Sequence, residues 1–210
     1  MTSELHLRRR TRLPADERRR QIIDVATSVI AERGFWGLSI QDVADSCGLT
    51  VNGVLHHVGS KNGLLVAVLD HRDREDVRAL AEILGLPYPT SGWTPEDLAA
   101  VAQERRMGLA ELCAAVVERN AGQPEIVRLY SLLEAESLSP DHPAHDYFSA
   151  RQRITLEGFA RLAPADVDAP TLARHLLALM DGLQLQWLRD AQIDLMAAWT
   201  QATREIDALS

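Results

Sequence analysis

Residues 38–61 read LSIQDVADSCGLTVNGVLHHVGSK, and this stretch decides the fold. Ser39, with Asp42 three residues later, forms a capping box that predicts a helix beginning at Ser39. Gly48 supplies the left-handed residue that a tight turn needs, and Thr50 can cap a second short helix. Apolar residues stand where two steeply crossing helices need a small shared core, at Val43, Cys47, Leu49 and Val54. The pattern predicts a helix-turn-helix, with an ordinary helical hairpin as the alternative.

The second helix of this motif carries polar and small residues on the face that points away from the shared core. Such side chains bond the phosphate oxygens and base edges of DNA. The outward set comprises Thr50, Val51, Asn52, Gly53, His56 and His57. We therefore expect this helix to contact DNA.

Residues 38–61, with flanks that reach from about 14 to 70, resemble the N-terminal signature of the TetR family of transcriptional regulators. That signature joins a helix containing an Ile/Val-Ala step to a glycine turn, a recognition helix, a Ser-Lys pair and a Leu-rich fourth helix. The resemblance implies a DNA-binding head followed by a helical body for ligand binding and dimerisation. It also implies DNA contacts from Ser39, Gln41, Thr50, Val51, Asn52, Gly53, His56, His57 and Lys61, with Lys61 on a phosphate beside a helix N-terminus.

Two positions depart from the signature. Leu55 stands where the family usually has tyrosine, and Val58 stands where it usually has phenylalanine. The first change removes a phenol that commonly meets the DNA backbone, whereas the second only shrinks a core aromatic. Leu55 leaves two alternatives, a regulator without specific DNA contact or one in which His56 or His57 carries more of that contact.

Charge is divided unevenly along the 210 residues, whose formal net charge is −8. Residues 1–62 hold nine Arg or Lys against seven carboxylates, which is +2, so the remainder carries −10. A basic head beside an acidic body is expected where only the head meets a polyanion. We expect the cationic arm that precedes Pro14 to contact the DNA backbone or minor groove through Arg8, Arg9, Arg10 and Arg12.

The composition, 46% hydrophobic and 5% aromatic, is typical of a Leu/Ala-rich all-α protein. No apolar run reaches the roughly 18 residues of a membrane span, and the first residues lack the apolar core of a secretory signal. We therefore expect a cytoplasmic protein without membrane contact. Cys47 and Cys113 form no metal-binding pair and are interpreted as buried thiols.

Capping, glycine and proline signals divide the chain into about nine helices. A head over residues 1–62 and a body over residues 63–210 are the expected domains. The fourth helix has a very polar middle, residues 70–76, which predicts an exposed stretch between two buried ends. The expected helices cover residues 14–33, 39–47, 50–57, 61–84, 94–120, 123–137, 145–162, 171–189 and 193–209.

The last two expected helices carry more apolar surface than one subunit needs. Residues 177–187 also resemble the penultimate helix of family members with a BetI-type C-terminal domain. The last helix has a seam of its own, spaced by four and three residues, at Leu195, Trp199, Ala202, Ile206 and Leu209. We expect a homodimer joined through residues 171–209.

A body of this kind implies a pocket whose effector alters DNA binding. Polar or aromatic residues that interrupt apolar helix faces are the candidate lining, namely Met107, Tyr130, Glu134, Tyr147, Phe148 and Trp187. The leading hypothesis is a repressor that binds a palindromic operator as a homodimer and is released by a small, mainly apolar effector of unknown identity. The alternative is a small helical enzyme or metal-binding protein that uses Glu134 with His142 and His145. Because hydrolase, metalloprotease, phosphate-loop and di-iron motifs are missing, no catalytic residue, metal or cofactor is expected.

Overall fold

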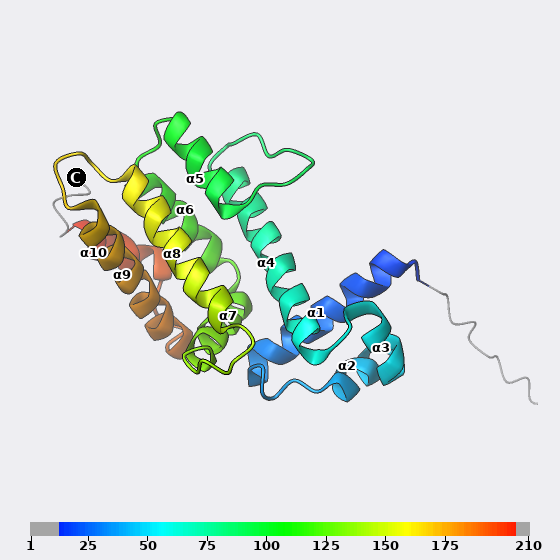
Figure 1. Cartoon of the computed structure of the whole chain (residues 1–210). Coiled ribbons are helices and arrows are strands. Elements are labelled where there is room, and N and C mark those ends of the chain that lie inside the picture. Colours follow the sequence, from blue (N-terminus) through cyan, green and yellow to red (C-terminus); the bar gives the residue numbers. More distant parts are fainter. Residues whose placement is uncertain (1–12, 205–210) are drawn as a thin grey trace, which may run out of the picture.

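The computed structural model describes residues 13–204, and all regular structure in this range is helical, as predicted. The predicted contacts of Arg8, Arg9, Arg10 and Arg12, and those of Ile206 and Leu209, lie outside the described residues. Ten helices follow one another (Figure 1): α1 (Ala15–Arg33), α2 (Ile40–Cys47), α3 (Val51–Val58), α4 (Lys61–Ile83), α5 (Pro95–Glu104), α6 (Leu109–Ala121), α7 (Pro124–Glu136), α8 (His145–Leu162), α9 (Ala169–Arg189) and α10 (Leu195–Arg204). None of these described helices is long and apolar enough to cross a bilayer.

The prediction of one helix over residues 94–120 is wrong, because the chain turns between α5 and α6. Arg106 adopts a left-handed conformation with φ 56°, and Gly108 begins the next helix. Apolar residues on both sides of the turn are buried, with Ala102 fully inaccessible and Leu109 only 2% exposed. The apolar period therefore continues through the break, and the sequence gives no strong stop signal there.

Local capping sets most of the helix ends. The Thr94 and Asp97 side chains each bond the other's backbone N–H, so a complete capping box begins α5. At α2 the predicted capping box is only half formed: the Ser39 hydroxyl accepts from the backbone N–H groups of Gln41 and Asp42. The Asp42 carboxylate turns instead to Arg33, 3.4 Å away.

Three apolar clusters hold the helices together. The N-terminal cluster joins α1, α2 and α3 to the first half of α4 and extends to Leu129 and Leu133 of α7. A second cluster packs α6, α8, α9 and α10, and a third packs the second half of α4 against α5 and α6. In Figure 1, α4 runs from the three N-terminal helices to the body, so a single helix belongs to two cores.

The predicted intersubunit role of Leu195 and Trp199 is wrong. They are 3% and 4% exposed within one subunit, where they pack against the cluster of α6, α8 and α9. Their spacing of four and three residues indicates that this helix face is buried. It does not indicate whether the same subunit or a second one covers the face. Any dimer contact of α9 and α10 must use other residues of these helices.

We expect Trp199→Ala to lower the free energy of unfolding by about 3–5 kcal/mol, because it removes a fully packed indole from the second cluster. Trp36→Ala is the matched control, because that indole is 63% exposed and its loss should cost less than about 1 kcal/mol. Urea unfolding followed by circular dichroism gives both values. If Trp199→Ala left the free energy of unfolding unchanged but abolished dimerisation, Trp199 would be a subunit-contact residue after all.

Candidate DNA-binding surface and effector cavity

The helix-turn-helix is built by short-range interactions around Gly48. This residue ends α2 in the left-handed conformation, with φ 64° and ψ 37°. Thr50 begins α3, and its hydroxyl accepts from the backbone N–H of Gly53 at 3.1 Å. Val43 and Val54 are fully buried between the two helices. The turn and the shared core fix how α3 projects from the head.

The predicted DNA-contact residues lie at the starts of α2 and α4 and along α3, and none of them is buried. Gln41, Thr50, Asn52 and His56 are exposed, whereas Ser39, Val51, Gly53, His57 and Lys61 are half-buried. The Gln41 amide donates to Asp45 at 2.8 Å, and the Lys61 ammonium stands 4.4 Å from the centre of the Phe35 ring. Their roles in binding DNA stay predictions.

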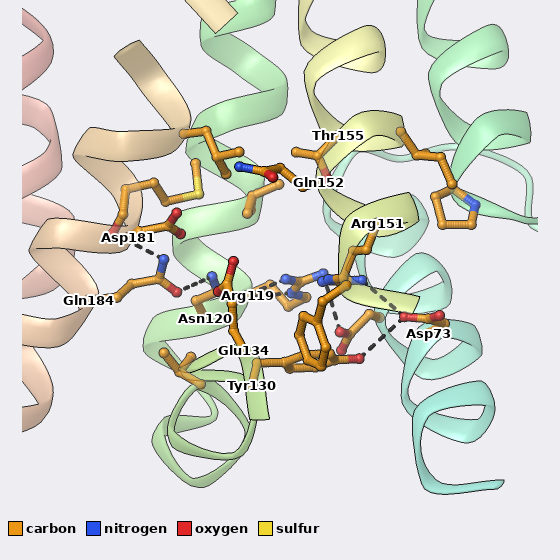
Figure 2. A pocket seen from close by; sticks show the side chains of 18 of the residues that line it. Asp73, Arg119, Asn120, Tyr130, Glu134, Arg151, Gln152, Thr155, Asp181 and Gln184 are labelled. Atoms are coloured by element: carbon orange, nitrogen blue, oxygen red, sulfur yellow. Dashed lines mark hydrogen bonds and ion pairs between the residues drawn. The ribbon is translucent and has the colours of Figure 1, made fainter. Parts of the chain in front are cut away.

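A cavity of about 460 Å³ lies within the body. Its walls come from α4, α5, α6, α7, α8 and α9 (Figure 2). Most of the lining is apolar, including Leu98, Leu112, Val116, Phe159 and Met180. Pockets of this size and character suit small organic ligands.

Asp73 of α4 organises one polar side of the cavity. Its Oδ1 accepts from the Tyr147 hydroxyl at 2.7 Å, the Arg151 guanidinium at 3.0 Å and the Tyr130 hydroxyl at 3.3 Å. The Arg151 guanidinium also stacks 4.5 Å from the centre of the Tyr130 ring. Burial raises the pKa of both tyrosines, so their hydroxyls remain neutral donors.

Asp76, one turn further along α4, is 4% exposed and anchors a second polar group. Its Oδ1 lies 3.0 Å from Arg72 and 3.4 Å from the amide nitrogen of Gln123, and its Oδ2 lies 3.8 Å from Arg119. The Oδ2 atom has no hydrogen-bond partner among the described residues. A chain of bonds continues from Arg119 through Asn120, whose amide donates to Gln184 at 2.7 Å.

Glu134 of α7 and Asp181 of α9 are cavity carboxylates with neither a hydrogen bond nor an ion pair to the described residues. Desolvation raises the pKa of Glu134, and the positive charge of Arg151 partly opposes this effect. Desolvation and the nearby negative charge of Glu134 raise the pKa of Asp181 to about 6. Both carboxylates are therefore less stable as anions here than they would be in water.

The N-terminal head is similar in sequence to known proteins. Residues 22–68 match the family "Bacterial regulatory proteins, tetR family". Over 62 residues the chain is 39% identical to the HTH-type transcriptional activator FasR of Mycolicibacterium smegmatis, which is 30% of this chain and 28% of that protein. Over 62 residues it is also 32% identical to the HTH-type transcriptional repressor KstR2 of Rhodococcus jostii, which is 27% of this chain and 30% of that protein. Over residues 22–68 this chain therefore has the DNA-binding head of the TetR family of transcriptional regulators.

The matches to these curated relatives span less than a third of their length, so the likeness does not extend to their bodies. The whole fold resembles that of native NalD, the secondary repressor of the MexAB-OprM multidrug efflux pump in Pseudomonas aeruginosa. The TM-score is 0.66 over 91% of this chain and 95% of that one, at 19% sequence identity. At this identity the likeness concerns the fold alone, and the resemblance to a BetI-type body stays a prediction.

The body places only three of the six predicted ligand-binding residues at the cavity. Tyr130, Glu134 and Phe148 line the cavity, whereas Met107, Tyr147 and Trp187 do not. Met107 and Trp187 pack against apolar clusters, and Tyr147 reaches the site only through its hydroxyl on Asp73. Which of the six bind a ligand stays a prediction.

The sequence analysis missed the charged cavity residues Asp73, Asp76, Arg119 and Arg151. The predicted exposed middle of α4 is wrong, because Asp76 is buried and Asp73 faces the cavity. A signal was present: Asp73 precedes the apolar Val77 by four residues and Asp76 precedes Leu80 by four, so the carboxylates share one helix face with them. Arg72 stands four residues before Asp76, but the other partners lie 43 to 78 residues away in the chain, so spacing alone could not show how far the charges are compensated.

The residues of the enzyme or metal alternative are separated by the fold. Glu134 lines the cavity, whereas the buried His142 ring packs edge-on against Phe35, with 5.1 Å between ring centres. The His142 Nδ1 accepts from the backbone N–H of Ala144, and the His145 Nδ1 bonds the Ser137 carbonyl oxygen at 2.7 Å. Over residues 13–204 no three His, Cys, Asp or Glu side chains gather in a metal-binding group. Both predicted thiols, Cys47 and Cys113, are buried and free.

Asp181→Asn should stabilise the protein near neutral pH by about 1–2 kcal/mol, because it removes a poorly solvated charge from a half-buried site. Since the folded-state pKa of Asp181, about 6, lies above its unfolded value, the folded protein binds more protons between these two values. The wild type should therefore gain stability from this group as the pH falls through 6, and the advantage of the variant should shrink.

Urea unfolding at pH 7.5, 6.0 and 5.0 measures this difference. Asp166→Asn is the matched control, because Asp166 is exposed and its replacement should give no comparable trend. A destabilised or pH-independent Asp181→Asn protein would contradict the proposed cost of that charge.

Proposed function

We propose that this protein represses transcription by binding a palindromic DNA operator as a homodimer, and that a small effector in the cavity releases it. The observation that carries the proposal is α3, which is fixed by its cap and core while Asn52 and His56 remain exposed. Asparagine can bond adenine edges in the major groove, and histidine can bond phosphates or bases. Such a role also implies a cytoplasmic protein.

One physical route between cavity and head is α4. Its first turns place Leu64, Leu65 and Val68 in the N-terminal cluster, where all three are fully buried. Three turns after Lys61 the same helix presents Asp73 to the cavity. A displacement of Asp73 by an effector would therefore be carried along one continuous helix to the head.

A second route, which the sequence did not suggest, is α7. Tyr130 and Glu134 line the cavity, and Glu136 at the end of the helix accepts from the backbone N–H of Phe35 at 2.7 Å. Gly34 makes this approach possible: it adopts φ +70°, and a Cβ there would lie 2.2 Å from a Glu136 oxygen. The carboxylate thus fastens α7 to the loop that joins α1 and α2.

These two routes support an effector-dependent switch. An effector can shift the spacing of the two recognition helices only if it binds the DNA-competent and DNA-incompetent forms unequally. Cavity residues on α4 and α7, two helices that also contact the head, satisfy this requirement. Among the named relatives, KstR2 and NalD are repressors and FasR is an activator, which favours repression.

For the homodimer we propose the outward face of α9, opposite its buried stripe, with the adjoining face of α10. Thr171, His175, Ala178 and Gly182 recur on this face at helical spacing. A side chain at Gly182 would meet nothing within 4 Å in the single chain, so a second α9 can approach closely there. The domain limits 1–62 and 63–210 also remain part of this proposal.

DNA binding is tested by selecting genomic fragments with the purified protein and titrating a recovered fragment by fluorescence anisotropy at several salt concentrations. Asn52→Ala should weaken specific binding about 10- to 100-fold and leave nonspecific binding unchanged, because it removes a base contact. Lys61→Ala should weaken binding to all DNA and reduce the salt slope by about one unit.

Gln201→Ala, an exposed amide on α10 away from the head, should bind as the wild type does. If no fragment is enriched and binding is independent of sequence, the protein is a regulator without specific DNA contact, as Leu55 suggested. An unchanged salt slope for Lys61→Ala would show that this lysine meets no phosphate.

Gly182→Arg should convert the dimer to a monomer, because the long side chain blocks the close approach of a second α9. It should not destabilise the subunit, because arginine has a higher helix propensity than glycine. Sedimentation equilibrium with circular dichroism measures both properties. The control is Gly108→Arg, at another position where an added Cβ meets nothing. A Gly182→Arg protein that stays dimeric would remove this face from the interface.

A further inference from the structure

We infer that the effector is an amphipathic cation, a protonated amine or amidine on an apolar body, whose charge is held by Glu134 and Asp181. The inference rests on the proposed function, because it assigns a ligand class to the cavity taken there as the effector site. Three observations support the inference. Two cavity carboxylates have no ion-pair partner, a buried carboxylate oxygen has no hydrogen-bond donor among the described residues, and most of the lining is apolar.

The cavity wall contains more negative than positive groups. Six charged residues line it, and four of them are carboxylates, at Asp73, Asp76, Glu134 and Asp181. The two arginines already have carboxylate partners: Arg151 lies 3.0 Å from Asp73, and Arg119 lies 3.8 Å from Asp76. Glu134 and Asp181 form no ion pair with the described residues and are influenced by Arg151 only from a distance, so a positive ligand would supply their direct partner.

The two uncompensated carboxylates are close enough to affect each other. After desolvation, the negative charge of Glu134 contributes to the raised pKa of Asp181. They come from different helices, α7 and α9, and both line the same space (Figure 2). A single cationic group can therefore reduce the electrostatic cost of both, which a neutral ligand cannot do.

A buried acceptor is also unused. The Asp76 Oδ2 atom is inaccessible to solvent and has no hydrogen-bond donor among the described residues, and its residue lines the cavity. Leaving such an acceptor unpaired costs free energy that a ligand N–H or a ligand-ordered water can recover. This site thus favours a ligand rich in donors.

An anionic effector would meet less favourable chemistry. Arg151, the most central guanidinium, already bonds Asp73 and stacks on Tyr130. An anion placed beside it would still face the exposed Glu134 and the half-buried Asp181, so it would add repulsion to two carboxylates that have no ion-pair partner among the described residues. The remaining lining is apolar, and the volume of about 460 Å³ accommodates an alkyl or aromatic body.

The test compares three probes that share one ten-carbon chain: decylamine, decanol and decanoate. Isothermal titration calorimetry on the full-length protein without DNA should show decylamine binding at least tenfold more tightly than decanol, and decanoate most weakly. A charge-assisted hydrogen bond to a poorly solvated carboxylate is strong enough to give such a ratio.

The double variant Glu134→Gln, Asp181→Asn removes both charges and nearly preserves shape. Its preference for decylamine over decanol should fall to about one, while decanol binds as it does to the wild type. Glu125→Gln, a change at an exposed carboxylate on the same α7 helix outside the cavity, should keep the full preference. Retained decanol binding shows that the double variant still folds around the cavity.

Equal binding of decylamine and decanol to the wild type would overturn the inference, as would tighter binding of decanoate or an undiminished preference in the double variant. Operator binding is measured separately by anisotropy. If specific DNA binding is present but the amine preference is absent, the ligand class is wrong and the regulator stands. If the amine binds but no operator is found, the proposed function fails while the cation site stands.

Discussion

The structure depends on the continuity of α4, whose two ends are embedded in different cores. Leu64 and Leu65 are sealed into the N-terminal cluster, and Val77 and Leu80 are packed into the third cluster. An α-helix of this length resists bending unless a proline, a glycine pair or an inserted group interrupts its ladder. Head and body are therefore joined by a stiff element, and the residues in its middle lie between the two cores.

Those middle residues are charged, and their compensation explains why the body can enclose a polar cavity. Three donors converge on Asp73, and Arg72, Gln123 and Arg119 surround Asp76. A buried charge without such partners is strongly unfavourable. Glu134 and Asp181 lack this compensation, so the cavity combines a rigid, neutralised side with a side whose charges remain to be balanced.

The joint between α7 and the head adds a second constraint. Glu136 occupies the space that a side chain at Gly34 would fill, and it bonds the Phe35 backbone. Phe35 in turn lies between the His142 ring and the Lys61 ammonium, so the loop after α1, the loop after α7 and the start of α4 meet at one aromatic ring. Contacts from α4 and from the end of α7 thus meet at the base of the head.

The all-α class, the helix-turn-helix and most helix ends can be predicted from local sequence. Those features arise from interactions within four or five residues, such as the Thr50 cap on Gly53 and the left-handed Gly48. The family signature lies in the same segment, so the predicted DNA-contact residues also came from it.

Which helix faces are buried, and which segments bury them, follows from the packing of helices that are distant in the chain. In the sequence, Leu195 and Trp199 fit a subunit contact as well as an internal one. In the structure, α6, α8 and α9 cover them. The sequence predicts that the charged middle of α4 is solvated, because the partners Arg119 and Arg151 are distant in the chain. Helical periodicity specifies that a face is apolar or polar, whereas burial depends on which distant segments pack against it, and no local pattern records that choice.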